Sequence, residues 1–474
     1  MRAEILEQFP RVDGAAVQAA LETEIQKDHH KIIVLDDDPT GVQTVHGISV
    51  YTDWTRESVR AGFEEENRAF YILTNSRGFT VDQTTRAHLE IGRTVAEVAR
   101  ELGRDYVIVS RGDSTLRGHY PLETDLLRQT MEEGGRPVDG EILCPYFKEG
   151  GRFTIGGVHY VRYGEELIPA GETEFAKDKT FGYRSSNLRE YIEEKTGGVY
   201  RKEDVTEISL EELRGLDYEG ITEKLLAVKD YGKVVVNAVD ACDLKIFCTC
   251  LYRAMAQGRR YLFRTAAGFV KEFAGISDKA LLTRSEMVKT ETSHGGIVVV
   301  GSHTQKTTSQ LEELKRLEGV EFLEFNSDLV LDDEAFAKEV EATVAKEEAF
   351  IAGGKTVVVY TKRRLLSLEG DTPEQALLRS VKISDAVQSL VGKLKVVPAF
   401  VVAKGGITSS DVGTKALRVK KATVLGQIRL GIPVWKTGSE STFPGIPYVI
   451  FPGNVGEVET LREAVEVLLG KEEA

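Results

Sequence analysis

The sequence predicts an α/β protein of two domains, each built on a mainly parallel sheet flanked by helices. Short apolar, β-branched segments alternate with amphipathic stretches over most of the chain. This alternation is typical of parallel strands that are covered by helices. In addition, 474 residues exceed what one hydrophobic core of ordinary size accommodates, which favours more than one domain.

The predicted strands are short, and no apolar run approaches the roughly 20 residues that a membrane-spanning helix needs. Within one predicted helix, Leu311, Leu314 and Leu317 recur at the spacing that places them on one face. Residues 150–198 are rich in glycine and charge and are expected to form loops or an excursion from the main sheet. Strands are expected at 31–35, 70–74, 106–110, 141–144, 234–238, 261–264, 297–301, 356–361, 399–403, 422–425 and 448–451, and helices at 308–317, 333–347, 372–391 and 458–469.

A polar, weakly periodic segment at 277–294 precedes a new strand and marks the expected domain boundary. We therefore expect a first domain at 1–285 and a second at 286–474. The formal net charge of −14 argues against nucleic-acid binding, which needs a basic surface. The first 30 residues lack the apolar stretch of a secretion signal, so a cytoplasmic enzyme is expected. The four cysteines form no CxxC pair, which predicts reduced structural thiols.

Three consecutive acids, Asp36–Asp38, follow the first predicted strand and lead into Pro39, Thr40 and Gly41. Ligands of parallel α/β sheets bind beyond the carboxyl ends of the strands. Three adjacent carboxylates there need solvent, a divalent metal or a set of substrate hydroxyls. A simple turn is the alternative, because Asp, Pro and Gly are turn residues.

The same segment also resembles the nucleophile motif of the haloacid-dehalogenase-like phosphatases, an apolar strand followed by Asp-x-Asp-x-Thr. Asp36 would then be the phosphorylated nucleophile and Asp38 the acid/base. Residues 71–75 resemble the second motif of that family. No later strand ends in a convincing lysine or acidic pair, and the second half of the chain is left without a role. This phosphatase remains an alternative.

Two further strand ends carry basic and hydroxyl-bearing residues. Arginine suits bidentate binding of a carboxylate or phosphate, serine and threonine bind hydroxyls, and Asp113 is able to accept a hydroxyl proton. Structural ion pairs are the alternative for the arginines. His119 is expected to be either catalytic or satisfied by a backbone group. The residues that together predict a site for a small polyhydroxylated anion are Asn75, Ser76, Arg77, Arg111, Asp113, Ser114, Thr115 and Arg117.

Three loops of small residues follow strands in the second half, at 301–304, 404–411 and 452–456. Paired glycines allow the backbone to approach a phosphate closely, and a strand, a glycine and a helix start form a favourable phosphate site. The GxxxxGK[ST] motif of P-loop proteins is absent. The loops predict a nucleotide site of another kind, in which Lys404 faces either a phosphate or solvent.

These motifs resemble those of the four-carbon acid sugar kinases over about residues 31–460. The resemblance is carried by Asp-Asp-x-Thr-Gly at 37–41, Asp-Ser-Thr-Leu-Arg-Gly at 113–118, TEFAKDKTFGY at 173–183, and the loops at 301–302, 405–408 and 453–456. Many members have Glu where Ile407 stands here, and Lys-Ser where Phe451 and Pro452 stand. The resemblance implies a sugar-acid-binding first part and an ATP-binding second part.

The implied activity is transfer of the ATP γ-phosphoryl group, with Mg²⁺, to a hydroxyl of a small, four-carbon-like sugar acid. Asp38 is the first choice for the base, with Asp37 or Asp113 as alternatives, and Arg111 and Arg117 would anchor the acid or the phosphoryl group. No metal ligand is assigned. A non-catalytic sugar-acid-binding protein is a further alternative, no nucleic-acid or membrane partner is expected, and a homodimer is compatible with the sequence. The remaining candidate residues are Thr40, Gly41, Asn75, Ser76, Arg77, Ser114 and Thr115 for the substrate, and Ser302, Gly405, Gly406, Ile407, Thr408, Gly453 and Asn454 for the nucleotide.

Overall fold

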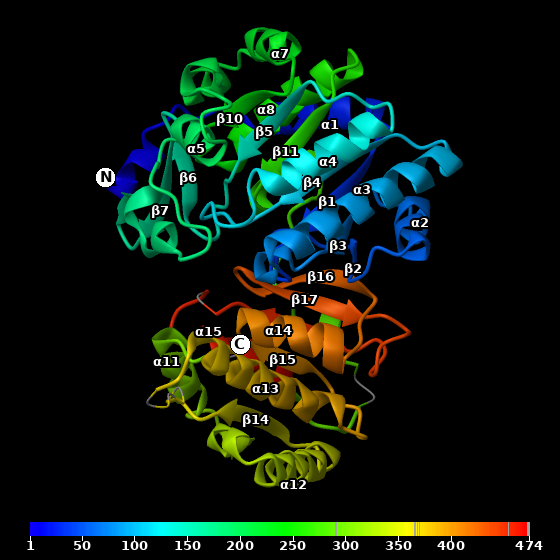
Figure 1. Ribbon diagram of the computed structural model, residues 1–474, viewed down its shortest axis with the longest axis vertical. Coiled ribbons are helices and arrows are strands. Elements are labelled where there is room, and N and C mark those ends of the chain that lie inside the picture. The colour runs from blue at the N-terminus through cyan, green and yellow to red at the C-terminus, as the bar shows by residue number, and fades with distance from the viewer. Residues whose placement is uncertain (290–291, 365, 367, 369, 454, 472–474) are drawn as a thin grey trace. The chain divides into compact units, whose positions relative to one another are not determined.

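The computed structural model (Figure 1) describes residues 1–289, 292–364, 366, 368, 370–453 and 455–471. The chain divides into two compact units. Unit 1 comprises Met1–Gly41 and Asp53–Asp278, and unit 2 comprises Val42–Thr52 and Lys279–Ala474. The chain thus enters unit 2 directly after the acidic loop and returns at Asp53. The boundary expected after residue 285 lies seven residues into unit 2 (279–285), and the excursion of residues 42–52 was not predicted.

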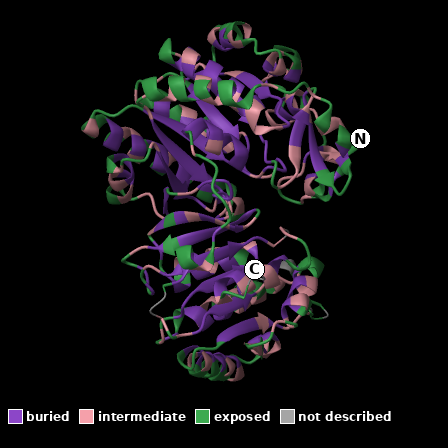
Figure 2. Ribbon diagram, turned by 180° about the vertical axis from the view of Figure 1, so that it is seen from behind, coloured by how far each residue is buried: buried purple, intermediate pink, exposed green. Residues whose placement is uncertain are grey.

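Unit 1 contains a seven-stranded sheet in which every pair of neighbours is parallel. Consecutive residues of its strands are buried, as Ile32, Ile33 and Val34 illustrate, so both faces of the sheet are covered. Figure 2 shows the strands as buried elements within a more exposed outer layer. The strand order is β3 (Ala69–Leu73), β1 (Lys31–Asp36), β4 (Tyr106–Arg111), β11 (Tyr261–Thr265), β5 (Gly140–Cys144), β10 (Gly232–Val236) and β9 (Thr206–Ile208).

Apart from α5, the helices of unit 1 pack in two groups, one formed by α2, α3 and α4 and the other by α1 and α6–α9 around α8. The longest of them, α3, starts at a capping box in which Thr80 and Gln83 bond each other's backbone N–H groups, and it ends at Gly103 with φ of 59°. Such caps satisfy backbone groups that a helix end leaves unpaired. The bounds are α1 Gly14–Lys27, α2 Arg56–Glu64, α3 Val81–Leu102, α4 Leu122–Glu133, α5 Leu188–Lys195, α6 Leu210–Arg214, α7 Tyr218–Ala227, α8 Ala241–Ala256 and α9 Ala267–Ala274.

The glycine-rich segment that was expected to leave the main sheet forms a separate antiparallel sheet of three strands. These are β6 (Arg152–Ile155), β7 (Val158–Tyr163) and β8 (Glu166–Pro169), followed by α5. A hydrophobic cluster joins this sheet and α5 to the residues that follow β4; it contains Leu116, Val161, Tyr183 and Tyr191. The excursion is therefore a packed part of unit 1.

Unit 2 has five parallel strands, extended by three antiparallel ones. Leu311 and Leu314 of α11 are fully buried, and Leu317 packs against the same core. The strand order is β13 (Val320–Phe325), β14 (Thr356–Thr361), β12 (Ile297–Val300), β15 (Val401–Lys404), β18 (Pro447–Phe451), β17 (Ile432–Thr437), β16 (Lys421–Arg429) and β2 (Ser49–Tyr51). The helices are α10 (Arg284–Met287), α11 (Gln305–Leu314), α12 (Asp333–Ala352), α13 (Pro373–Gly392), α14 (Gly406–Asp411) and α15 (Thr460–Leu469).

The structure confirms the predicted fold class of two mainly parallel sheets with flanking helices. All four cysteines are free, and burial raises the pKa of the Cys144 thiol to about 12, as suits a structural thiol. Among the residues that the structure describes, no helix is long and apolar enough to cross a membrane.

Candidate functional site

Three parallel strands end side by side in unit 1, and each is followed by one of the predicted polar loops. Asp36 at the end of β1 lies in register with Leu73 of β3 and with Arg111 of β4. The acidic loop, the residues after β3 and the residues after β4 therefore meet at one edge of the sheet, as parallel strands require. The cluster formed by their side chains is called the arginine–aspartate site below.

Asp36 lies beneath this site and is sealed from solvent. Its carboxylate Oδ1 is 3.0 Å from Arg111 Nη1, which is also 3.5 Å from Asp37 Oδ1. Burial raises the pKa of Asp36 to about 7, against the opposing effect of Arg111. Gly41 closes over the carboxylate so tightly that a Cβ there would lie 2.0 Å from Asp36 Oδ2. Asp36 is therefore a buried support of the loop, and only glycine fits above it.

Arg77 holds the other two acids of the loop. Its Nη2 and Nε lie 2.6 and 3.2 Å from the two oxygens of Asp37, and its Nη1 lies 3.2 Å from Asp38 Oδ2. The backbone N–H and the hydroxyl of Thr40 donate to Asp38 Oδ1 at 2.8 and 2.5 Å. Burial alone would raise the pKa of Asp38, but Arg77 and Thr40 bring it below its ordinary value. Asp38 is ionised, and at 18% it is the most exposed carboxylate of the three.

The loop after β4 contributes a second carboxylate–arginine pair. Arg117 Nε lies 2.7 Å from Asp113 Oδ2, and the hydroxyl of Thr115 donates to the same oxygen. Although burial opposes ionisation, Arg77 and Arg117 hold the pKa of Asp113 well below its usual range. Asp113 is thus permanently charged at neutral pH.

The conformation of this loop is fixed by side chains that bond its backbone. Leu116 has φ of 69° and Gly118 has φ of 119°, values that are costly for a residue with a side chain. Three of the four donors come from the excursion at 150–198. Four consecutive carbonyls accept hydrogen bonds: Ser114 from His159 Nε2 (2.8 Å), Thr115 from Tyr183 (2.7 Å), Leu116 from Tyr191 (2.8 Å) and Arg117 from Arg264 Nη2 (3.1 Å).

Arg264 is a residue of the site that the sequence did not single out. It is the second-last residue of β11, in register with Ser110 of β4, and its Nη1 lies 2.7 Å from Glu123 Oε2. A Cβ on Gly112 would lie 2.2 Å from Arg264 Cζ, so the loop wraps around the guanidinium group. The only sequence signal was an arginine at the end of a predicted apolar strand, at the same edge as Arg111.

Some predicted residues support the site from below. Ser76 is fully buried and donates to Glu123 Oε1 at 2.5 Å. Asn75 adopts the left-handed region with φ of 55° at the turn after β3. His119 bonds the carbonyl of Phe79 at 3.0 Å, which is the backbone-satisfied alternative for that residue. Ser114 and Thr115 are both buried, and the hydroxyl of Thr115 is engaged by Asp113.

His159, which bonds this loop, makes the free energy of unfolding depend on pH in a measurable way. A carbonyl only accepts, so Nε2 carries the proton toward Ser114 and Nδ1 accepts from the Thr154 hydroxyl, 3.0 Å away. Burial holds the pKa of His159 at about 4, below its ordinary 6.5. Between these values the unfolded chain binds a proton that the folded chain does not, so the free energy of unfolding falls as pH drops from 6.5 to 4, by at most about 3 kcal/mol.

We expect His159→Gln, whose amide is able to donate to the same carbonyl, to flatten this part of the stability–pH curve. The measurement is chemical denaturation at several pH values. His29→Gln, at an exposed position, is the control and should leave the slope unchanged. Equal slopes for wild type and His159→Gln would contradict a neutral buried imidazole.

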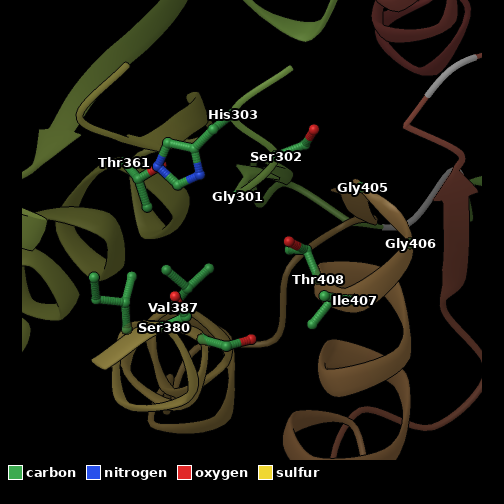
Figure 3. A pocket seen from close by; sticks show the side chains of 12 residues that line it. Gly301, Ser302, His303, Thr361, Ser380, Val387, Gly405, Gly406, Ile407 and Thr408 are labelled. Carbon is green, nitrogen blue, oxygen red and sulfur yellow. The ribbon is translucent and has the colours of Figure 1, made fainter. Parts of the chain in front are cut away.

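Unit 2 contains a pocket of about 310 Å³ at the ends of its central strands (Figure 3). Gly301–His303 follow β12, Thr361 ends β14, and Gly405–Thr408 follow β15. Glycine is required at two of these positions. A Cβ on Gly301 would lie 2.3 Å from Thr408 Oγ1, and Gly405 has φ of 121°. The opposite wall belongs to α13 and consists of Ser380, Ile383, Ser384 and Val387.

The pocket combines small, hydroxyl-bearing residues with an aliphatic part. Ser302 and Thr408 lie on the glycine side, whereas Val387 projects from α13 (Figure 3). Ile407, 74% exposed, also lines the pocket. Gly453 lies near Ser302, since a Cβ on Gly453 would be 3.9 Å from Ser302 Oγ. Asn454 lies outside the described residues.

Lys404 was expected to face a phosphate or solvent, and the structure shows neither. The side chain is completely buried and Nζ donates to the carbonyls of Pro452 and Gly453, at 2.7 and 3.2 Å. Burial, together with Lys306, lowers the pKa of Lys404 to about 7. Lys404 therefore ties the glycine loop after β15 to the loop after β18.

The fold and these two sites define a two-domain α/β protein with an arginine–aspartate site on one sheet and a glycine-lined pocket on the other. A sugar-binding N-terminal domain matches residues 32–273, and a nucleotide-binding C-terminal domain matches residues 297–461. The chain belongs to the family that these two domains define, the four-carbon acid sugar kinase family.

Solved structures share this architecture. A Haemophilus influenzae protein, from a family described as a domain of unknown function, is 19% identical with a TM-score of 0.62, over 92% of this chain and 100% of its own. A Salmonella typhimurium LT2 protein, provisionally described as a tRNA synthase, is 16% identical with a TM-score of 0.65, over 92% and 99%. At these identities the likeness shows a shared fold and nothing more. No curated protein is similar enough to count as a match.

Proposed function

We propose that the protein is an ATP-dependent kinase that phosphorylates a hydroxyl group of a small, four-carbon-like sugar acid. The observation that carries the proposal is Asp38, an ionised and partly exposed carboxylate beside the guanidinium group of Arg77. A carboxylate that receives a hydroxyl proton, next to cations that neutralise an anionic substrate, is what phosphoryl transfer to an alcohol requires. The sugar-binding and nucleotide-binding domains support the same function.

The pocket of unit 2 fits ATP. Gly301, Gly405 and Gly406 line it without side chains, and glycine backbone allows close approach by phosphates. The aliphatic part formed by Ile383, Val387 and Ile407 suits the apolar faces of a base. Bound ATP with Mg²⁺ would supply the phosphoryl group and part of its charge neutralisation. The residues that would hold the nucleotide are Ser302, Gly405, Gly406, Thr408 and Gly453.

The described residues contain no group of three or more His, Cys, Asp or Glu side chains suited to hold a metal ion. The acids of the acidic loop are bonded to Arg77 and Arg111 instead. This fits Mg²⁺ carried by phosphate oxygens and water, since that ion is seldom bound in an all-protein cage.

The residues of unit 1 would then orient the acid and accept a proton. Thr40 donates two hydrogen bonds to Asp38 Oδ1 and so fixes the orientation of the carboxylate. Asp38 then accepts the proton of the reacting hydroxyl. Arg77 keeps Asp38 ionised in the resting state. Catalysis of this kind depends on positioning and charge neutralisation more than on covalent chemistry.

The geometry weighs against the phosphatase alternative. A phosphorylated nucleophile has to reach its substrate, but Asp36 is 1% exposed, covered by Gly41 and paired with Arg111. Its raised pKa also leaves the carboxylate partly protonated at neutral pH. The phosphatase hypothesis predicts that the protein hydrolyses an aryl phosphate without ATP and that Asp36→Asn abolishes this hydrolysis. The kinase hypothesis predicts neither result.

The proposal is tested by coupled ADP release across a panel of four- to six-carbon sugar acids. We expect acid-dependent ADP formation in wild type, and its loss in Gly301→Val, whose side chain would collide with Thr408. No acid-dependent ADP across the panel would refute the kinase. Tight binding of an acid without ADP formation would favour a binding protein.

A further inference from the structure

The three-stranded excursion of unit 1 brings another arginine to the arginine–aspartate site. Arg152 begins β6, and its guanidinium carbon lies 5.7 Å from the centre of the Phe175 ring. Arg117 stacks on the same ring at 5.0 Å. Asp113, the ion-pair partner of Arg117, is close enough to act electrostatically on both arginines. Two guanidinium groups thus share one aromatic ring, and of the two it is Arg117 that forms ion pairs, with Asp113 and, at 3.9 Å, with Asp178.

Arg152 differs from the other arginines of the site because none of the described carboxylates forms an ion pair with it, and Asp113 and Glu174 act on it only from a longer distance. Within the described residues, Arg152 has no carboxylate within 4.0 Å and no side-chain hydrogen bond, and its Nε is completely buried without an acceptor. Burial lowers the pKa of Arg152, and Arg117 adds to that effect. The other four arginines all have carboxylate partners: Arg77 with Asp37 and Asp38, Arg111 with Asp36 and Asp37, Arg117 with Asp113, and Arg264 with Glu123.

A purely structural role does not account for this arrangement. An arginine that only packs on Phe175 gains a modest cation–π attraction of about 0.5–2 kcal/mol. Arg152 is half-buried, but leaving its buried Nε without an acceptor costs about 1–3 kcal/mol, which an anion that accepts from the guanidinium group would offset. The neighbouring strand shows the ordinary alternative, because Arg162 on β7 is exposed and donates Nε to the carbonyl of Gly164.

We propose that Arg152, with Arg117 across Phe175, binds the anionic group of the substrate, the carboxylate of a small hydroxy acid. Guanidinium groups bind carboxylates through paired, charge-assisted hydrogen bonds, and such a ligand would supply the directly bonded carboxylate that Arg152 lacks. The inference rests on the proposed function for identifying the ligand as a substrate. In this proposal Arg152 and Arg117 bind the carboxylate of the substrate, whereas Asp38 faces the reacting hydroxyl.

The experiment is calorimetric binding without nucleotide, using four-carbon sugar acids and the matching uncharged alditols. We expect Arg152→Met to weaken acid binding about 10- to 100-fold, toward the affinity of the alditol. Arg152→Lys, which keeps the charge but not the paired donors, should lose less. Arg162→Met on the adjacent strand is the matched control and should bind as wild type does.

Thermal unfolding separates binding from structure. Removing an uncompensated charge should leave the Tm of ligand-free Arg152→Met unchanged or raised, whereas a structural arginine would give a lowered Tm with unchanged affinity. Undiminished acid binding by Arg152→Met, or no binding of any panel acid by wild type, overturns the inference. Acid binding that depends on Arg152 without any ADP release would refute the kinase and leave this inference standing.

Discussion

Asp38→Asn is expected to lower kcat for phosphorylation of the sugar acid by about 10²–10⁴-fold, the usual contribution of a general base. Asparagine keeps the size of Asp38 and is able to accept from Thr40 through its carbonyl oxygen, but it does not take up the hydroxyl proton. The KM for ATP should change little, because the residues proposed to hold the nucleotide belong to unit 2. Steady-state kinetics by coupled ADP release measure both constants.

The matched control is Asp82→Asn, on the exposed first turn of α3, which should leave kcat unchanged. Because the pKa of Asp38 lies below its ordinary value, protonation of Asp38 itself should not lower the wild-type rate above about pH 4. Undiminished phosphorylation by Asp38→Asn would contradict this role and leave Asp37 or Asp113 as the proton acceptor.

The location of this site followed from the sequence, but its electrostatics did not. Apolar strands that end in polar loops predict which residues meet at the sheet edge, and Asp36, Arg77 and Arg111 do meet there. Which acid pairs with which arginine depends on a few ångströms of side-chain placement. The sequence therefore could not distinguish Asp36, buried under Gly41, from Asp38, which is partly exposed.

The residues that sequence reasoning missed act across long separations in the chain. Arg264 supports a loop about 150 residues earlier, and His159 and Tyr191 bond the same loop from an excursion whose strands are only four to six residues long. Short strands rich in glycine and charge carry a weak periodic signal. The strand β2 was missed because three residues are too few for a periodic pattern.

Arg264→Met is expected to destabilise the protein by about 3–5 kcal/mol, because it leaves the buried carboxylate of Glu123 without its cation. Both side chains are nearly inaccessible, at 6% and 2%. Arg264 also bonds the carbonyl of Arg117 and fills the space enclosed by Gly112 and Gly118. Chemical denaturation measures the loss, and Arg260→Met, at an exposed position just before β11, is the control.

The pH dependence of that loss distinguishes a missing charge from a missing side-chain volume. In wild type, burial would raise the pKa of Glu123, but Arg264 and His88 hold it below the ordinary value, so this carboxylate stabilises the fold above about pH 4.5. In Arg264→Met the pKa of Glu123 should rise instead, and stability should fall as pH rises through that value. The difference in the free energy of unfolding between the two proteins is therefore expected to be widest at neutral pH and to narrow below pH 4.

Adding Glu123→Gln to Arg264→Met should recover part of the loss at neutral pH. A gap that is independent of pH, with no recovery in the double variant, would mean that Arg264 supports the loop through its volume alone.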